Sequence, residues 1–122
     1  MLLHIVDNAR WSAALIEGTY TPPGFDRDGF IHLSAPHQVL RPANLLYRGR
    51  TDLSLLVIDE SALPPAALAW ERGSHGEDED FPHLYAPLPV MAVQRVLAFP
   101  CAADGSFVLP TGVSAGMGEE RP

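Results

Sequence analysis

Residues 28–39, which read DGFIHLSAPHQV, decide how the chain is best interpreted. Within this segment, FIHLS at 30–34 has the apolar and aromatic content of a short strand. Because successive side chains of a strand point to opposite faces, Phe30, His32 and Ser34 share one face and the two apolar residues between them share the other. One face of this predicted strand suits a hydrophobic core, and the other places an imidazole beside a hydroxyl.

The residues before this strand predict a strand, a helix and a loop. LLHIV at 2–6 has the character of a short buried strand. A helical period follows, with Asp7 or Asn8 as the N-terminal cap and Gly18 as the end. Residues 19–29 contain two prolines and two glycines, so we expect a loop without regular structure there.

The residues after the strand predict a second helix. Ser34 can cap its N-terminus, Pro36 is tolerated in its first turn, and Gly49 can end it. Pro42 conflicts with a continuous helix, because proline lacks an amide donor and crowds the preceding turn. We therefore expect a kink or a restart at Pro42.

The second half of the chain predicts strands. DLSLLVIDE at 52–60 is apolar on both faces, which is typical of a central strand covered on both sides. Shorter strands are expected at 68–72 and 81–85, and the longest at 90–99, followed by a turn at 104–105. Two early helices and several late strands predict an α+β fold, with a mixed or antiparallel sheet and the helices on one side.

The composition limits the functions that the chain can carry out. Its 122 residues suit a single compact domain, expected at 1–110, followed by a glycine-rich tail at 111–122 that we expect to be mobile. The formal net charge is -7 and every basic residue is arginine. This balance argues against nonspecific nucleic-acid binding, and the lack of lysine excludes a Schiff-base mechanism.

The sequence also predicts a compartment. No apolar run approaches the roughly 18 residues that a membrane span needs, and the first residues lack the basic start of a signal peptide. The single cysteine, Cys101, can form no internal disulfide. We therefore expect a cytoplasmic protein without membrane contact, and the oligomeric state stays open.

Three histidines in predicted strands are the main candidates for a site: His4, His32 and His83. Each has apolar neighbours, and a buried imidazole without a hydrogen-bond partner is costly. His83 shares its strand face with Tyr85, and Glu71 adds a carboxylate at the end of the strand at 68–72. A ligand could therefore be held between an imidazole, a phenol and a carboxylate.

Purely structural roles for these residues stay open. Ser34 can serve as a helix cap, and the aromatic side chains can belong to the core. A zinc site built from three histidines and a water is a further alternative, although the HxH and HxxxH spacings are missing. We predict no metal ligands.

Four segments resemble a known family. GFIHLS, DLSLLVID, WE and FPHLYAPL are similar, in this order and spacing, to the bacterial and plant family called domain of unknown function 952, over about 3–110. That resemblance implies a compact α+β domain and supplies no activity. LLHIV and FIHLS are also similar to the two histidine-bearing strands of RNA 2′-phosphotransferases, which belong to the ADP-ribosyltransferase superfamily.

The second resemblance implies an ADP-ribosyltransferase-like fold and a site. It would place His4 against the ribose of NAD and His32 with Ser34 at the nicotinamide pocket, and either Glu71 or His83 would complete the site. The implied activity is an NAD-dependent glycosyl or phosphoryl transfer.

We therefore predict a histidine-lined cleft that binds NAD or an ADP-ribose-type ligand. A non-catalytic small-molecule-binding or regulatory module and a histidine-ligated metal protein remain the alternatives. The residues expected to act in catalysis are Glu71, His32 and His83, and those expected to bind the ligand are His4, Phe30, His32, Ser34 and Tyr85.

Overall fold

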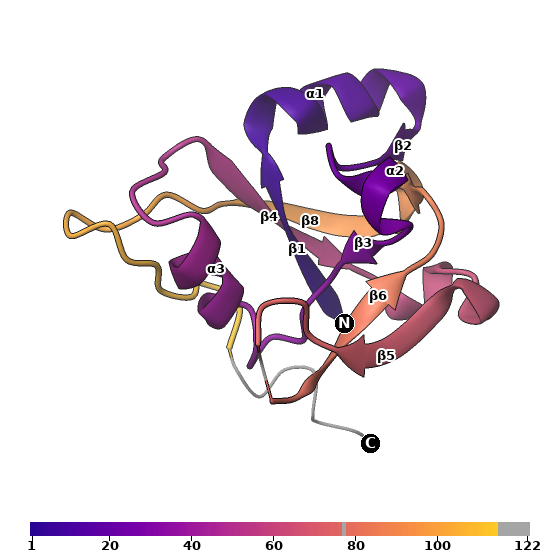
Figure 1. Ribbon diagram of the computed structural model, residues 1–122. Coiled ribbons are helices and arrows are strands. Elements are labelled where there is room, and N and C mark those ends of the chain that lie inside the picture. The colour runs from indigo at the N-terminus through magenta and orange to yellow at the C-terminus, as the bar shows by residue number, and fades with distance from the viewer. Residues whose placement is uncertain (77, 115–122) are drawn as a thin grey trace.

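The structure is a computed structural model that describes residues 1–76 and 78–114. Its strands form two three-stranded sheets and one two-stranded sheet, and all pairings are antiparallel (Figure 1). The predicted α+β class is confirmed, whereas three small sheets replace the single sheet that we expected. The helices are α1 Asn8–Glu17, α2 Phe25–Asp28 and α3 Leu40–Leu46, and the strands are β1 Leu2–Asp7, β2 Thr19–Tyr20, β3 Ile31–His32, β4 Leu53–Ile58, β5 Leu68–Arg72, β6 Asp80–Leu84, β7 Leu88–Pro89 and β8 Val93–Ala98.

The first sheet is built around β4, which pairs with β1 on one side and β8 on the other. All six residues of β4 are buried, as its apolar sequence predicted. Leu56 and Ile58 enter one hydrophobic cluster, whereas Leu55 and Val57 enter a second. Because alternate residues of a strand face opposite ways, the two clusters lie on the two faces of this sheet.

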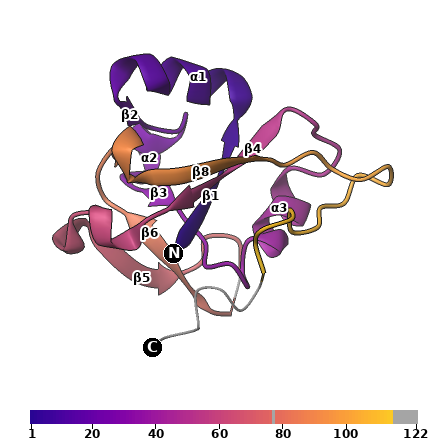
Figure 2. The ribbon, with the colours of Figure 1, turned by 180° about the vertical axis from the view of Figure 1, so that it is seen from behind.

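The helices do not lie on one side of the first sheet, as expected from the sequence. Trp11 and Ala14 of α1 pack in the cluster that contains Leu56. Ala43 of α3 packs in the cluster that contains Leu55. Figures 1 and 2 show α1 and α3 on different sides of the strands. Each helix thus covers one face of the buried strand β4.

The second three-stranded sheet has the order β3–β6–β5. Its register places His32 opposite His83. Ile31 and Leu33 are fully buried in the core, so the alternation expected for the FIHLS segment is confirmed. A backbone bridge joins this sheet region to β1, because Leu3 and Ser34 exchange N–H···O bonds of 2.7 and 2.9 Å.

Helix α1 follows the sequence prediction at both ends. The Asp7 carboxylate accepts hydrogen bonds from the backbone N–H groups of Ala9 and Arg10, which caps the N-terminus. Gly18 ends the helix in the left-handed conformation, with φ of 89°. This helix thus fixes the direction of the chain between the first sheet and the segment at 19–29.

The segment at 19–29 is more ordered than its composition suggested. Thr19–Tyr20 pairs with β7, and Phe25–Asp28 forms one helical turn that ends at Gly29 with φ of 80°. The expectation of an irregular loop was wrong because prolines at 22 and 23 and the two glycines here shape a helical turn instead of preventing one.

The second helix starts later than predicted. Ser34 is not its cap, since its backbone pairs with Leu3 and α3 begins at Leu40. Pro42 then lies in the first turn of α3, where its missing N–H costs nothing, so no kink is required. The helix ends at Leu46, and Gly49 follows in a left-handed turn.

The last strand is shorter than expected. Residues 90–92 form a 3-10 turn, and β8 has six residues, the same number as β1 and β4. The chain reverses near 104–105, as predicted, through hydrogen bonds between Ala102 and Ser106 and between Gly105 and Ala102. Most of the tail that we expected to be mobile, 115–122, lies outside the described residues, while Val113 is buried against the second cluster.

Candidate functional site

A cavity of about 480 Å³ lies where residues of both three-stranded sheets meet. Its volume is in the range of small-molecule sites. One wall comes from the segment at 22–28, a second from α3, and a third from residues 73–75. Five of the predicted site residues line it: His4, Phe30, His32, Ser34 and His83.

His4 bridges the point where β1 separates from the second sheet. A single backbone bridge, the Leu3–Ser34 pair, joins the two, and beside it Nδ1 of His4 lies 2.7 Å from the carbonyl oxygen of His32. A carbonyl oxygen only accepts, so Nδ1 carries the proton and donates it. The His4 side chain thus replaces a backbone donor, which is why a histidine can occupy a buried strand.

The tautomer of His4 leaves its other nitrogen as an acceptor. Burial lowers the pKa of His4 to about 4, so the ring is neutral near pH 7. Among the described residues, its buried Nε2 has no hydrogen-bond partner. An unpartnered buried polar group of this kind costs about 1–3 kcal/mol. The lone pair of this nitrogen is therefore left unsatisfied by the described residues.

His83 has the same arrangement on β6. Its Nδ1 lies 2.8 Å from Oε1 of Glu71, which also accepts a 2.5 Å hydrogen bond from the hydroxyl of Tyr85. These bonds, that of Tyr85 first, hold the pKa of Glu71 below its usual range, so Nδ1 of His83 faces an ionised carboxylate and donates to it. The Nε2 atom of His83 is buried and has no partner among the described residues.

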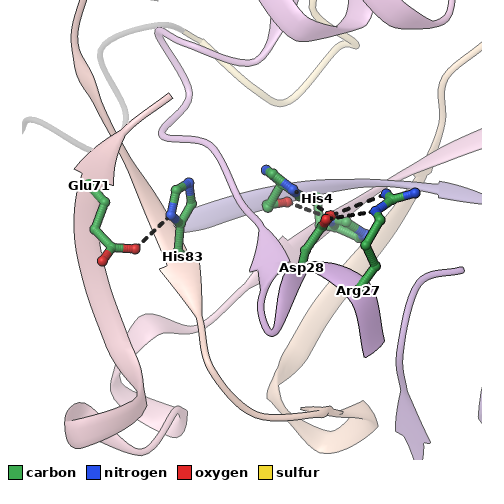
Figure 3. Close-up of polar contacts among 6 residues, drawn as sticks. His4, Arg27, Asp28, Glu71 and His83 are labelled. Atoms are coloured by element: carbon green, nitrogen blue, oxygen red, sulfur yellow. Dashed lines mark hydrogen bonds and ion pairs between the residues drawn. The ribbon is translucent and has the colours of Figure 1, made fainter. Parts of the chain in front are cut away.

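Glu71 and Tyr85 hold His83 from behind and do not line the cavity. Figure 3 shows the contact between Glu71 and His83. Glu71 retains 44% side-chain exposure, whereas His83 retains 3%. The carboxylate therefore fixes the ring orientation and tautomer of His83. Of the two residues that could complete the site, His83 lines the cavity, whereas Glu71 does not line it and is hydrogen-bonded to His83.

Phe30 contributes an aromatic surface. Its ring stacks on His83 with a centroid separation of 4.1 Å and an interplanar angle of 8°, and it meets the rings of His32 and Tyr85 at larger angles. These contacts fix the plane of the His83 imidazole. They also place an apolar face against the imidazoles of His83 and His32.

His32 points to a different partner from the other two histidines. Its Nε2 lies 3.2 Å from Oδ2 of Asp28, which is also bonded to Arg27 (Figure 3). Arg27 first, and His32 second, hold the pKa of Asp28 below its ordinary value. The side chain of His32 is thus tied to the wall at 22–28 and is not a third unpartnered acceptor.

Sequence reasoning missed Arg27, Asp28 and His75, which all line the cavity. Arg27 and Asp28 lie in the segment that we expected to be an irregular loop, and His75 lies between glycines in an acidic stretch. No periodic pattern marks them. The signal that was present is the run PPGFDRDG itself, which combines turn residues with an Arg–Asp pair immediately before the predicted strand.

The arrangement gives no support to the histidine-metal alternative. Within 1–76 and 78–114, no group of three or more His, Cys, Asp or Glu side chains is placed to hold a metal ion.

Among the residues that the structure describes, no helix is long and apolar enough to cross a membrane.

Comparisons with known proteins agree with the first resemblance. The chain matches, over residues 5–96, the family described as protein of unknown function, DUF952. It is 37% identical to protein CC0527 from Caulobacter crescentus, whose crystal structure superposes with a TM-score of 0.79 and covers 88% of this chain and 93% of that one. The solution structure of CC0527, also at 37% identity, gives a TM-score of 0.74, with 86% and 89% covered.

A search among curated proteins found no match. The family match spans most of the domain, including β1 from Ile5, all of β3 to β6 and most of β8. On the family match and the similarity to CC0527, this chain belongs to the DUF952 family.

Proposed function

We propose that the cavity binds a small ligand that carries hydroxyl or N–H donors, and that this ligand is NAD or an ADP-ribose-type molecule. The observation that carries the proposal is the pair of buried imidazole nitrogens, Nε2 of His4 and Nε2 of His83, which have no hydrogen-bond partner among the described residues. Two neighbouring ribose hydroxyls would supply two donors, and each would remove the desolvation cost of one nitrogen.

The surroundings of the two acceptors support a ribose-containing ligand. The face of Phe30 beside His83 suits a flat, apolar ring, and the remaining lining combines apolar side chains with a few polar groups. An ADP-ribosyltransferase-like arrangement is part of the proposal. Its support is that His4 on β1 and His32 on β3 come from separate sheets to one cavity.

If the ligand is turned over, His83 is the candidate general base. Its unprotonated Nε2 would accept a proton from a bound hydroxyl, and Glu71 would stabilise the resulting imidazolium through Nδ1. Glu71 would then act as a positioning residue, held by Tyr85. His32, tied to Asp28, would contribute to the same cavity wall.

A binding or regulatory module without turnover is the second candidate. The position of Glu71 favours it, because a carboxylate that does not line the cavity cannot contact an oxocarbenium-like ribose directly. Both candidates require the same ligand. They differ only in whether the nicotinamide–ribose bond is broken.

The experiment is an NMR titration of the protein, labelled with ¹⁵N on its imidazoles, with ADP-ribose and with NAD. We expect His4 and His83 to show the Nδ1–H tautomer, and their Nε2 signals to shift on ligand addition. His83→Gln should weaken binding by about tenfold, the effect of one lost hydrogen bond in a buried site. Release of nicotinamide from NAD is measured in parallel. Its detection would support the enzyme, and binding without it would support the non-catalytic binding module.

His37→Gln is the matched control, because His37 is half exposed and does not line the cavity. It should bind like the wild type. Nε2 signals that stay unchanged at saturating ligand, or equal affinities of the His83 and His37 variants, would contradict the proposal.

A further inference from the structure

Arg27 stands at the rim of the cavity in an unusually fixed position. Its Nε donates to Oδ1 of Asp28 at 2.9 Å, and its Nη2 lies 3.5 Å from Oδ2 of the same carboxylate. Its Nη1 has no hydrogen-bond partner among the described residues, and the side chain is 80% exposed. One edge of the guanidinium is therefore bonded to Asp28, while the rest of this cavity-lining side chain is exposed.

The backbone below Arg27 is shaped to receive the guanidinium. A Cβ atom added to Gly24 would lie 2.5 Å from Nη2 of Arg27, which is closer than real contacts allow. The φ of Gly24 is -93°, a value open to any residue, and the atom that a Cβ would meet is the end of the flexible Arg27 side chain, so a larger residue here would move the guanidinium. The guanidinium thus packs directly over Gly24.

The short helical turn holds this geometry. Phe25 N–H donates to Pro22, Asp28 N–H donates to Gly24, and Gly29 N–H donates to Phe25. Asp28 is itself held from the other side by Nε2 of His32. Arg27 is therefore preorganised by the wall of the cavity and by one of its histidines.

We propose that Arg27 is the phosphate-binding residue of the cavity and makes it selective for phosphorylated ligands. A fixed guanidinium with a free edge is well suited to a phosphate group, whose oxygens accept charge-assisted hydrogen bonds. The carboxylate of Asp28 engages both Arg27 and His32, so its charge is directed away from the open edge. The ligand would lie with its hydroxyls at His4 and His83 and its phosphate at the rim.

This inference rests on the proposed function, since it assigns the second end of the same ligand. It implies that ribose 5-phosphate binds more tightly than ribose, by about tenfold for one exposed charge-assisted contact. Because the contact is at the rim, added salt should reduce that preference.

The test is a calorimetric or NMR titration with ribose, ribose 5-phosphate and ADP-ribose. Arg27→Gln should remove the preference for ribose 5-phosphate and leave ribose binding unchanged. Gly24→Ala should weaken phosphate binding in the same direction, because its methyl group displaces the guanidinium. Arg10→Gln on α1, an exposed arginine away from the cavity, is the matched control and should keep the preference.

The outcomes separate the two proposals. If wild-type protein binds ribose 5-phosphate and Arg27→Gln binds it equally well, the role of Arg27 is overturned while the histidine site stands. If ribose 5-phosphate and ADP-ribose both lose affinity in the variant while ribose does not, the assignment of Arg27 is supported. No binding of any of the three ligands to folded wild-type protein overturns both proposals.

Discussion

At the scale of single residues, the histidines are explained by what each Nδ1 can reach. His4 donates to a backbone carbonyl and His83 to a carboxylate, so each ring is held in one orientation through its Nδ1. The roles could not be read from the sequence, because three histidines in similar apolar surroundings receive three different partners. His32, which the sequence marked most clearly, is the one whose Nε2 is already bonded.

The buried His4 predicts a loss of stability in acid. Its pKa is about 4 in the folded protein and 6.5 in the unfolded chain, so the unfolded state binds the proton first as the pH falls. The free energy of unfolding should therefore decrease between about pH 6.5 and pH 4, by roughly 3 kcal/mol from this residue. Above that window the contribution no longer changes with pH.

Urea unfolding at pH 7 and pH 4.5 measures this effect. His4→Gln keeps a side-chain N–H that can donate to His32 but does not titrate, so the variant should show a smaller stability loss over the same interval. His37→Gln, at a half-exposed histidine, should behave like the wild type. A wild type and a His4 variant with the same pH dependence would show that folding does not lower the pKa of His4.

At the scale of elements, the strength of the local sequence pattern explains which predictions were confirmed. Strands β4 and β6 and helix α1 carry strong local patterns, and the structure places them as expected. The wall at 22–28 was missed because its prolines and glycines, which also suit an irregular loop, here form a hydrogen-bonded helical turn. The late start of α3 was missed because Ser34 pairs with Leu3, which is distant in the sequence, rather than with the helix.

Because both faces of β4 are buried, we expect truncation of a side chain on either face to lower the free energy of unfolding by a similar amount. Leu55 and Leu56 are both fully buried, in different clusters. Truncating either to alanine should cost about 2–5 kcal/mol of unfolding free energy, by loss of apolar contact and creation of a cavity. Val96→Ala on the exposed part of β8 should change it by about 0.5 kcal/mol or less.

Chemical denaturation of the three variants checks this prediction. A mild effect at Leu55 together with a severe effect at Leu56 would mean that only one face of the sheet is covered by a packed core. A large effect at Val96 would mean that the exposed side of β8 is buried in solution.

At the scale of the whole molecule, the two hydrophobic clusters share one strand. Because β4 contributes side chains to both, neither cluster can be lost while the other keeps its full packing. We therefore expect one cooperative unfolding transition. Trp11, buried in the first cluster, provides a fluorescence signal from one side, and far-ultraviolet circular dichroism reports on all elements.

The measurement uses a Trp70→Phe variant, since Trp70 is half exposed and would dilute the fluorescence of Trp11. The two denaturation curves should coincide. Curves with separate midpoints would indicate that the clusters unfold independently and that β4 is not a shared element in solution.

The backbone bridge between Leu3 and Ser34 has a consequence for how this domain can diversify. The core side chains beside His4 and His32 set the strand alternation that aims both histidines. The wall at 22–28 gives only Phe25 to the core, and that residue is only partly buried. The residues of this wall can therefore be exchanged with little effect on the core, while the imidazoles of His4 and His32 are inherited with the packing that keeps the protein folded.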